Sequence, residues 1–249
     1  MNDELKFTVI SDTHYYSKKN FVDGFDKNKK PKPGQLFFSR SEEIVEHTFD
    51  CLCKNDTPDI VLISGDLTYN GERTSHDEMK AALKKLQQKG KRVYVITATH
   101  DYTTPRMPTY GIDKNDKYIE VESVKRTQLL KYYGDFGYNN AIAKHKSTMS
   151  YVAQLADGYR LFALNDDYGD PDCGFSDELM NWVKTEANNA KRDGQYIIAM
   201  THHPLVPPSP IYAAVGKGAM LDDSELRRRQ LAGLGFDFGL TGHTRMQNV

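Results

Sequence analysis

The sequence lacks the features that mark several classes of protein. No apolar run approaches the roughly 18 residues that a membrane-spanning helix needs, so we expect no membrane span. The three cysteines are an odd number at spacings that suit neither a disulfide framework nor a zinc knuckle, and we interpret them as buried free thiols. The formal net charge is −1 and the basic residues are scattered, so we do not expect nucleic acid as a partner.

The start of the chain also lacks the apolar core of a signal peptide. Residues Met1 to Lys6 are mostly polar, and the first apolar run follows directly. We therefore expect a soluble, cytoplasmic protein for the chain as given, and a secreted one if a leader was removed. The 249 residues carry no linker that would divide them and can bury one full core, which predicts a single domain over residues 1–249.

Five short apolar runs each lead into residue types that bind metal ions. The run Phe7 to Ile10 leads into Asp12-Thr13-His14, and the run Val61 to Ile63 leads into Gly65-Asp66. Open α/β sheets place their sites outside the carboxyl ends of the strands, so these side chains are expected to meet there. The sequence therefore predicts a metal site at one edge of a sheet. The three later runs lead into His100-Asp101, His202-His203 and His243.

Helical patterns separate several of these runs. Two stretches around Ala156-Asp157-Gly158, residues 148–155 and 159–165, predict an antiparallel hairpin. Alternation of strands and helices followed by a hairpin predicts an α/β fold with mixed sheets. Helices are expected over residues 39–54, 75–89, 121–133, 177–192 and 222–234, and we interpret His47, His76 and His145 as surface or helix residues.

The order of the motifs resembles that of the calcineurin-like metallophosphoesterases over essentially the whole chain, and the run from Gly65 to Glu72 resembles the bacterial branch of that family. The resemblance implies a layered sandwich of mixed β-sheets flanked by helices, here lacking the C-terminal strands that usually close the sheet. It also implies a binuclear metal centre. The motifs that carry the resemblance are Asp12-Thr13-His14, Gly65-Asp66, His100-Asp101, Thr201-His202-His203-Pro204 and Gly242-His243-Thr244.

The resemblance implies a role for each of five residues as a metal ligand. Asp12 and His14 would bind the first ion, Asp66 would bridge both ions, and His202 and His243 would bind the second. The cofactors would be divalent ions such as Mn, Fe or Zn, one or two per chain. A hydroxide that bridges them would attack a phosphomonoester or phosphodiester, so the expected partner is a small phosphorylated substrate.

Further residues of the same motifs would act on the substrate or behind the ligands. His100 would act as general acid or as a clamp on the phosphoryl oxygens, with Asp101 orienting its imidazole. His203 is expected behind the ligands, because in relatives the ligand stands two residues before the proline. Tyr69 occupies a position at which purple acid phosphatases carry a phenolate ligand, although the wall of the pocket is the favoured interpretation.

Two positions depart from the family pattern. Thr99 stands where relatives have the asparagine that binds the second ion, and Arg245 stands where they have the last histidine of the first site. The centre would then keep one ion with Arg245 as a phosphate clamp, bind two ions weakly, or bind none. We expect a phosphoesterase of low activity. The alternative is a catalytically degenerate relative that binds a phosphorylated ligand, and a nuclease is a lesser possibility that the balanced charge disfavours.

Overall fold

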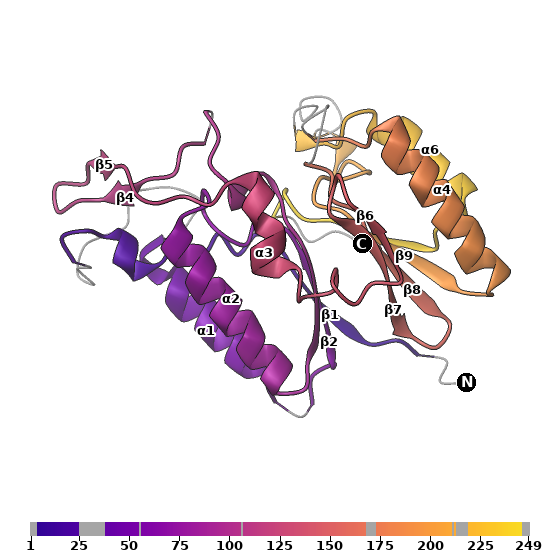
Figure 1. The fold of residues 1–249 in the computed structure, drawn as a ribbon, viewed down its shortest axis with the longest axis horizontal. Helices are drawn as coiled ribbons and strands as arrows, with labels where there is room; N and C mark the ends of the chain where they lie inside the picture. Colours follow the sequence, from indigo (N-terminus) through magenta and orange to yellow (C-terminus); the bar gives the residue numbers. More distant parts are fainter. Residues whose placement is uncertain are drawn as a thin grey trace.

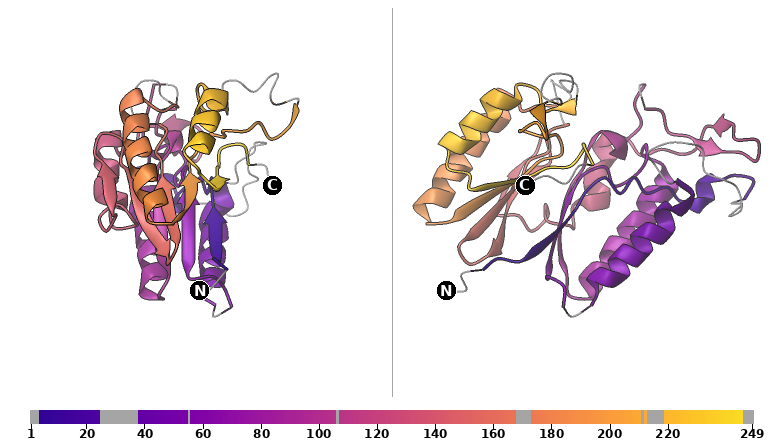
Figure 2. Two further views of the ribbon diagram at one scale, coloured as in Figure 1. Left: turned by 90° about the vertical axis from the view of Figure 1, so that its right-hand side faces the viewer. Right: turned by 180° about the vertical axis from the view of Figure 1, so that it is seen from behind.

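The computed structural model describes residues 4–24, 38–54, 56–105, 107–167, 173–210, 212 and 219–245. In this part of the chain two β-sheets lie face to face, and helices cover the outer face of each sheet (Figure 1, Figure 2). This layered α/β arrangement of mixed sheets flanked by helices is the fold that the sequence predicts. No helix of the described residues is long and apolar enough to cross a membrane.

The first sheet contains three parallel strands in the order β1-β2-β3. The central strand β2 is buried along its whole length, because helices cover one of its faces and the second sheet covers the other. Parallel neighbours need a crossover connection, and helices α1 and α2 provide the two crossovers. The elements of this half are β1 (Phe7–Ile10), α1 (Ser41–Leu52), β2 (Ile60–Ser64), α2 (Arg73–Gln88) and β3 (Arg92–Ile96).

The second sheet contains five strands in the order β10-β9-β8-β7-β6. Strands β6, β7 and β8 form the expected antiparallel meander, whereas β8, β9 and β10 are parallel. Helices α4 and α6 cover the outer face of this sheet (Figure 1). The elements are β6 (Ala143–His145), β7 (Ser150–Ala156), β8 (Tyr159–Ala163), α4 (Asp177–Arg192), β9 (Tyr196–Met200), α6 (Ser224–Gly233) and β10 (Phe238–Leu240).

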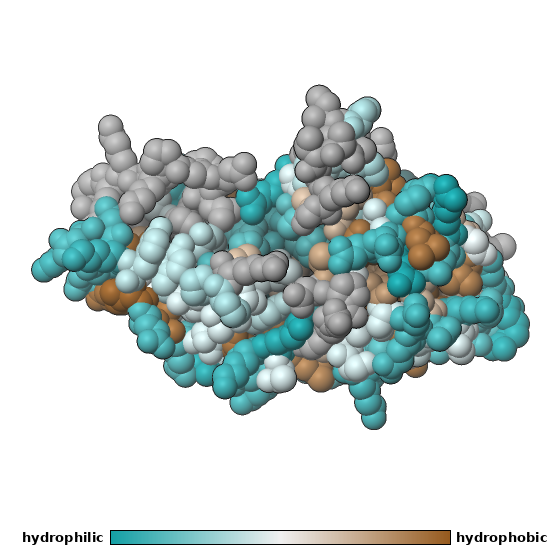
Figure 3. All heavy atoms as spheres, turned by 90° about the horizontal axis from the view of Figure 1, so that it is seen from above, coloured by the Kyte–Doolittle hydropathy of each residue, from teal (hydrophilic) through white to brown (hydrophobic). Residues whose placement is uncertain are grey.

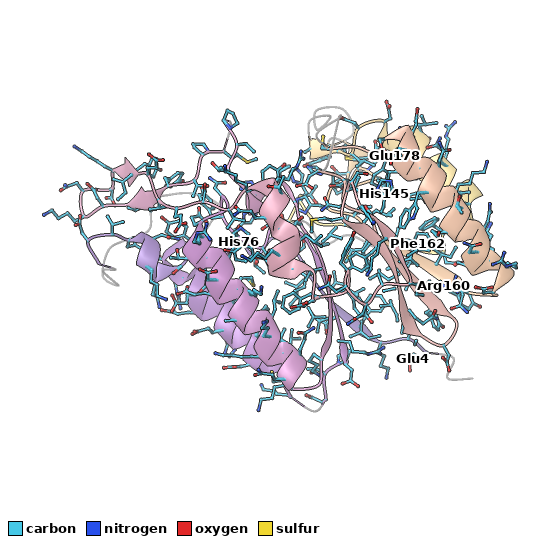
Figure 4. The ribbon with its side chains drawn as sticks, in the orientation of Figure 1. Glu4, His76, His145, Arg160, Phe162 and Glu178 are labelled. Carbon is cyan, nitrogen blue, oxygen red and sulfur yellow. The ribbon has the colours of Figure 1, made fainter. Side chains whose placement is uncertain are left out.

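Three apolar clusters hold the layers together. Successive residues of β2 belong to two of these clusters. Ile63 packs toward α1 and α2, whereas Leu62 packs toward the second sheet. On the far side, Phe162 of β8 and Val183 of α4 belong to the same apolar cluster (Figure 4 labels Phe162). The alternation of side chains along a strand thus places one sheet between two apolar layers.

One expected helix is much shorter than predicted. Of residues 121–133, only α3 (Leu129–Tyr133) is an α-helix. The backbone before it is drawn away from helical geometry because the Val124 N–H donates to the Gly71 carbonyl at 2.8 Å. Contact with a distant loop therefore overrides the local pattern. The short antiparallel strands β4 (Gly111–Ile112) and β5 (Tyr118–Ile119) lie at the left in Figure 1.

Two smaller predictions need correction or fall outside the described residues. The three cysteines, Cys51, Cys53 and Cys173, are free, but each is partly exposed, so the prediction of buried thiols was wrong. The strands expected to be missing would follow Arg245, and residues 246–249 lie outside the described part of the chain.

A buried carboxyl group stands at the start of α2. Glu72 has no exposed surface, and its Oε1 accepts the Asn70 N–H at 3.1 Å. Its Oε2 is buried without a hydrogen-bond partner among the described residues. Burial raises the pKa of Glu72 to about 7, because water no longer solvates the ionised form.

This carboxyl group should make stability depend on pH. The unfolded chain releases the Glu72 proton near 4.5, whereas the folded protein keeps it until about 7, so the free energy of unfolding falls over that interval. We expect the free energy of unfolding of wild type to fall on the order of 3 kcal/mol over that interval, and Glu72→Gln to lack this fall. Urea unfolding of both proteins across the interval measures it, with the exposed Glu120→Gln as the matched control. Parallel profiles for wild type and Glu72→Gln would contradict the prediction.

Candidate metal centre

The carboxyl ends of strands from both sheets meet at the upper edge of the molecule in Figure 1. Backbone hydrogen bonds connect the loops there. The Asp12 N–H donates to the Gly65 carbonyl at 3.2 Å, and the Gly242 N–H donates to the His202 carbonyl at 2.9 Å. Figure 3 views this edge from above and shows many hydrophilic side chains between the parts drawn in grey. The expected ligands from distant segments therefore face one region.

Several residues of this region have an unusual backbone conformation. Asp12, His14, Asp66, His243 and Arg245 have φ values of 54°, 39°, 52°, 68° and 53°. The left-handed region costs a residue with a side chain on the order of 1–2 kcal/mol, and such residues concentrate at functional sites. The turns after the strands thus adopt costly conformations that direct these side chains toward one another.

Asp66 lies at the middle of the cluster. Its Oδ2 is 3.2 Å from His202 Nε2 and 3.6 Å from His14 Nε2. Its Oδ1 accepts the His100 N–H at 3.0 Å. Burial raises the pKa of the Asp66 carboxyl, but the nearby His202 imidazole outweighs this effect and holds it well below the usual range. Asp66 is therefore a buried carboxylate that faces histidines from both sheets.

Two further predicted ligands lie beside it. His202 Nδ1 donates to the Ser64 carbonyl at 2.8 Å, which leaves Nε2 facing Asp66. His243 Nδ1 lies 3.3 Å from the same Nε2. Burial opposes the protonation of His202, yet Asp66 raises the pKa of its imidazole to about 10. For His243, burial and the neighbouring histidines lower the pKa to about 4.

Asp12 and His14 occupy the other side of Asp66. Asp12 Oδ2 accepts the His243 N–H at 2.8 Å and the Ser11 hydroxyl proton. Asp12 Oδ1 is buried without a hydrogen-bond partner among the described residues and lies 3.7 Å from His14 Nε2. A cation bound next to a buried carboxylate oxygen of this kind would provide the partner that the oxygen lacks.

His203 lies closer to the predicted ligands than we expected. Its ring centroid is 4.4 Å from that of His243, and its Nδ1 is 3.1 Å from Asp166 Oδ1. Asp166 Oδ2 also accepts the backbone N–H groups of His202 and His203, at 3.0 and 2.7 Å. The sequence reasoning missed Asp166, although β8 is a further apolar run that leads into carboxylates.

The predicted role of Asp101 is wrong. Its two carboxylate oxygens accept the N–H groups of Thr68 and Ala98, each at 2.9 Å, so Asp101 fixes the loops rather than the neighbouring imidazole. His100 is instead oriented through Nδ1, which donates to the Tyr69 carbonyl at 2.5 Å and to Asn70 Oδ1 at 2.8 Å.

His76 supports the same loop from behind, which the sequence did not reveal. It is fully buried on α2, where its Nδ1 lies 2.6 Å from the Tyr133 hydroxyl and its Nε2 lies 3.0 Å from the Asp101 carbonyl (Figure 4). His145 is remote from this region and lies 3.6 Å from Glu178 of α4. Of these two histidines, only His76 positions part of the site.

Three more predicted residues border the cluster. Thr99 is partly exposed and opens a 3₁₀ turn, Thr99–Asp101. Tyr69 accepts a hydrogen bond from the Tyr110 hydroxyl at 3.0 Å, and its ring centroid is 6.1 Å from that of His100. Arg245 Nη2 lies 2.9 Å from His14 Nε2.

A groove of about 310 Å³ opens on the Arg245 side of the cluster. Asp12, His14 and Arg245 line one wall, and residues of α1, among them Ser41 and Thr48, line the other. The groove is large enough for a small ligand and brings it to a carboxylate, an imidazole and a guanidinium.

The donor atoms fit a divalent ion on one side of Asp66 better than on the other. Potential ligand atoms lie within 4.8 Å of one another in three sets, and imidazole nitrogen with carboxylate oxygen suits Zn, Mn or Fe. On the side of His14 the Arg245 guanidinium already contacts the nitrogen that would bind the ion. The sets are His202 with His203 and His243, His14 with Asp66 and His100, and Asp12 with Asp66 and His202.

Comparisons with known proteins show which folds this chain resembles. The fold is similar to that of a dimetal phosphatase from Danio rerio, with a TM-score of 0.62, 12% sequence identity, and coverage of 95% of this chain and 80% of that one. It is also similar to the purple acid phosphatase PPD1 from yellow lupin, with a TM-score of 0.57 and 15% identity. That alignment covers 95% of this chain but 37% of the lupin chain.

Among curated proteins, no match was found. The bacterial branch suggested by the run after Gly65 stays a prediction. The family model for calcineurin-like phosphoesterases matches residues 5–245, which is nearly the whole chain and includes every motif from Asp12 to Arg245. The chain belongs to the calcineurin-like phosphoesterase family.

Proposed function

We propose that this protein is a metal-dependent hydrolase of phosphomonoesters or phosphodiesters. The observation that carries the proposal is the position of Asp66, whose Oδ2 faces His202 at 3.2 Å and His14 at 3.6 Å. Family membership supports a metal-dependent phosphoester hydrolase at a general level. When bound, a divalent ion supplies Lewis-acid chemistry and activates water for attack on phosphorus.

The histidines of the cluster would bind the metal through oriented rings. His202 and His203 are each fixed through Nδ1, by the Ser64 carbonyl and by Asp166 respectively, so both rings present Nε2 to the cluster. Partners of this kind set the tautomer of an imidazole and raise its basicity toward a metal. Asp12 and Asp66 add the negative charge that a divalent ion requires.

The substrate would bind between the groove and His100. Burial lowers the pKa of His100, whereas the Asp66 carboxylate opposes this shift. A bound phosphoryl group adds further negative charge and favours the protonated ring, which then donates a proton or a hydrogen bond to the leaving oxygen. The Arg245 guanidinium can bind a phosphoryl oxygen from the opposite side.

Removal and replacement of the metal test this proposal. We expect EDTA to abolish hydrolysis of p-nitrophenyl phosphate and bis-p-nitrophenyl phosphate, and added Mn²⁺ or Zn²⁺ to restore it, because the chain's own groups do not activate water without an ion. Release of nitrophenol is measured before and after dialysis. Hydrolysis that is indifferent to both treatments would reject the mechanism.

A second candidate is a relative that binds a phosphorylated ligand without turnover. The contact between Arg245 and His14 favours it, because the guanidinium binds phosphate without any metal. Calorimetry with inorganic phosphate on EDTA-treated protein separates the two candidates. Phosphate binding together with no turnover under any added metal supports the binding protein, and metal-restored turnover supports the hydrolase.

A further inference from the structure

We infer that the centre binds one divalent ion, at Asp66 and the three histidines His202, His203 and His243, and that the guanidinium of Arg245 replaces a second ion beside His14. The inference rests on the proposed metal-dependent hydrolase and says how many ions it uses and where. We call the first group the histidine side and the group of Asp12, His14 and Arg245 the arginine side.

The arginine side leaves no free lone pair on His14 Nε2. A guanidinium stays protonated and can only donate hydrogen bonds, so Arg245 Nη2, at 2.9 Å, donates to His14 Nε2. That nitrogen is also the atom that lies 3.6 Å from Asp66 Oδ2 and 3.7 Å from Asp12 Oδ1. A metal between these oxygens would need the same lone pair, so Arg245 and an ion exclude each other there.

Charge supports the same assignment. Asp12 and Asp66 place two carboxylates beside His14, and both are almost entirely buried. Buried carboxylates need compensating positive charge, and the Arg245 guanidinium places one such charge against the His14 imidazole beside them. Arg245 reaches this position from a left-handed backbone conformation, φ 53°, so the turn after β10 is shaped to deliver it.

The histidine side has the opposite character. The potential ligand atoms of His202, His203 and His243 lie within 4.8 Å of one another. His243 Nδ1 is 3.3 Å from His202 Nε2, and that Nε2 is 3.2 Å from Asp66 Oδ2. Three imidazole nitrogens thus lie close together, and one of them, His202 Nε2, also faces the Asp66 carboxylate.

His203 supplies the ligand that Thr99 cannot. Relatives use an asparagine amide oxygen at the position of Thr99, and a threonine hydroxyl is a shorter and poorer ligand. His203 enters from the loop after β9 with its Nδ1 engaged by Asp166, the arrangement by which a carboxylate orients a metal-binding imidazole. A ligand set of three imidazoles and one carboxylate favours Zn²⁺ over the harder ions Mg²⁺ and Ca²⁺.

Metal stoichiometry tests the inference. Wild type and variants are dialysed against excess Zn²⁺ and then analysed for metal per chain. We expect one ion in wild type and two in Arg245→His, which restores a ligand and removes the guanidinium. We expect His203→Gln to bind Zn²⁺ at least about tenfold more weakly and His14→Gln to bind it as wild type does. The matched controls are the surface substitutions Arg228→His and His47→Gln.

A second measurement, electron paramagnetic resonance, reports whether the bound ions are isolated or coupled. Wild type loaded with Mn²⁺ should give the electron paramagnetic resonance spectrum of an isolated ion, whereas Arg245→His should give that of two coupled ions. Two ions in wild type, or a single ion lost in His14→Gln but kept in His203→Gln, would overturn the inference and leave the metal-dependent hydrolase intact. No ion in wild type or in Arg245→His would overturn both.

Discussion

Asp66→Asn should abolish nearly all hydrolysis, with kcat/KM for p-nitrophenyl phosphate reduced on the order of 10³-fold. The Asp66 carboxylate faces His202 at 3.2 Å and His14 at 3.6 Å through a single oxygen, so the two sides of the centre share it. An asparagine keeps the shape and the oxygen that accepts the His100 N–H, but it carries no negative charge to hold a metal ion. The loss of hydrolysis should therefore be accompanied by a lower metal content per chain, whereas the fold should stay unchanged.

The backbone conformation of Asp66 calls for a matched control. Asp116 has a φ of 63°, close to the 52° of Asp66, and lies in the connection between β4 and β5. Asp116→Asn should leave hydrolysis and metal content as in wild type, because the same change is made in the same backbone conformation outside the metal centre. Asp66→Asn protein that keeps more than about a tenth of the wild-type rate would contradict the role of Asp66.

The layers of the fold and the meeting point of the motifs could be predicted because their signals are local. An apolar run followed by Asp or His is visible in the sequence, and parallel strands necessarily end at the same edge of a sheet. Asp12, Asp66 and His202 come together for this reason. The same rule could have found Asp166, because its strand is parallel to β9 and also ends at this edge.

The direction of individual side chains could not be predicted in the same way. Asp101 follows His100 directly, but its carboxylate accepts the N–H groups of Thr68 and Ala98 while the imidazole turns toward Tyr69. Neighbouring residues in a tight turn point in different directions. Asp is one of the residue types that tolerate the left-handed region, but its presence at position 66 does not by itself predict that conformation. Sequence spacing therefore brought these residues to the site but did not assign their partners.

The two departures from the family pattern, Thr99 and Arg245, bear on how many metal ions the centre binds. Arg245 was visible as a replaced ligand, but the sequence left three outcomes open for the metal ions. The hydrogen bond to His14 Nε2 at 2.9 Å narrows them, because one lone pair cannot serve both a guanidinium and a metal. The sequence also shows that Thr99 lacks the amide of the family's asparagine ligand. Only the position of the His203 ring beside that of His243 points to a residue that could replace this ligand.

Gly65→Ala should displace the imidazole of His202 and is the second change with a large expected effect. Gly65 has a φ of +95°, and an added Cβ would lie 2.7 Å from the Ala98 Cβ and 2.9 Å from His202 Nδ1. That nitrogen donates to the Ser64 carbonyl, so the methyl group must displace the ring from its orienting partner. We expect the free energy of unfolding to fall by about 2–4 kcal/mol and kcat to fall on the order of 10²-fold.

Gly158→Ala separates the two causes of this effect. Gly158 has a similar φ of +82°, but nothing lies within 4 Å of an added Cβ in the turn between β7 and β8. The control should therefore cost about 1–2 kcal/mol for the backbone conformation alone and leave kcat unchanged. Urea unfolding and hydrolysis of p-nitrophenyl phosphate are measured for both variants. If Gly65→Ala loses no more stability than the control and keeps its kcat, the close approach of Gly65 to His202 does not position the metal ligand.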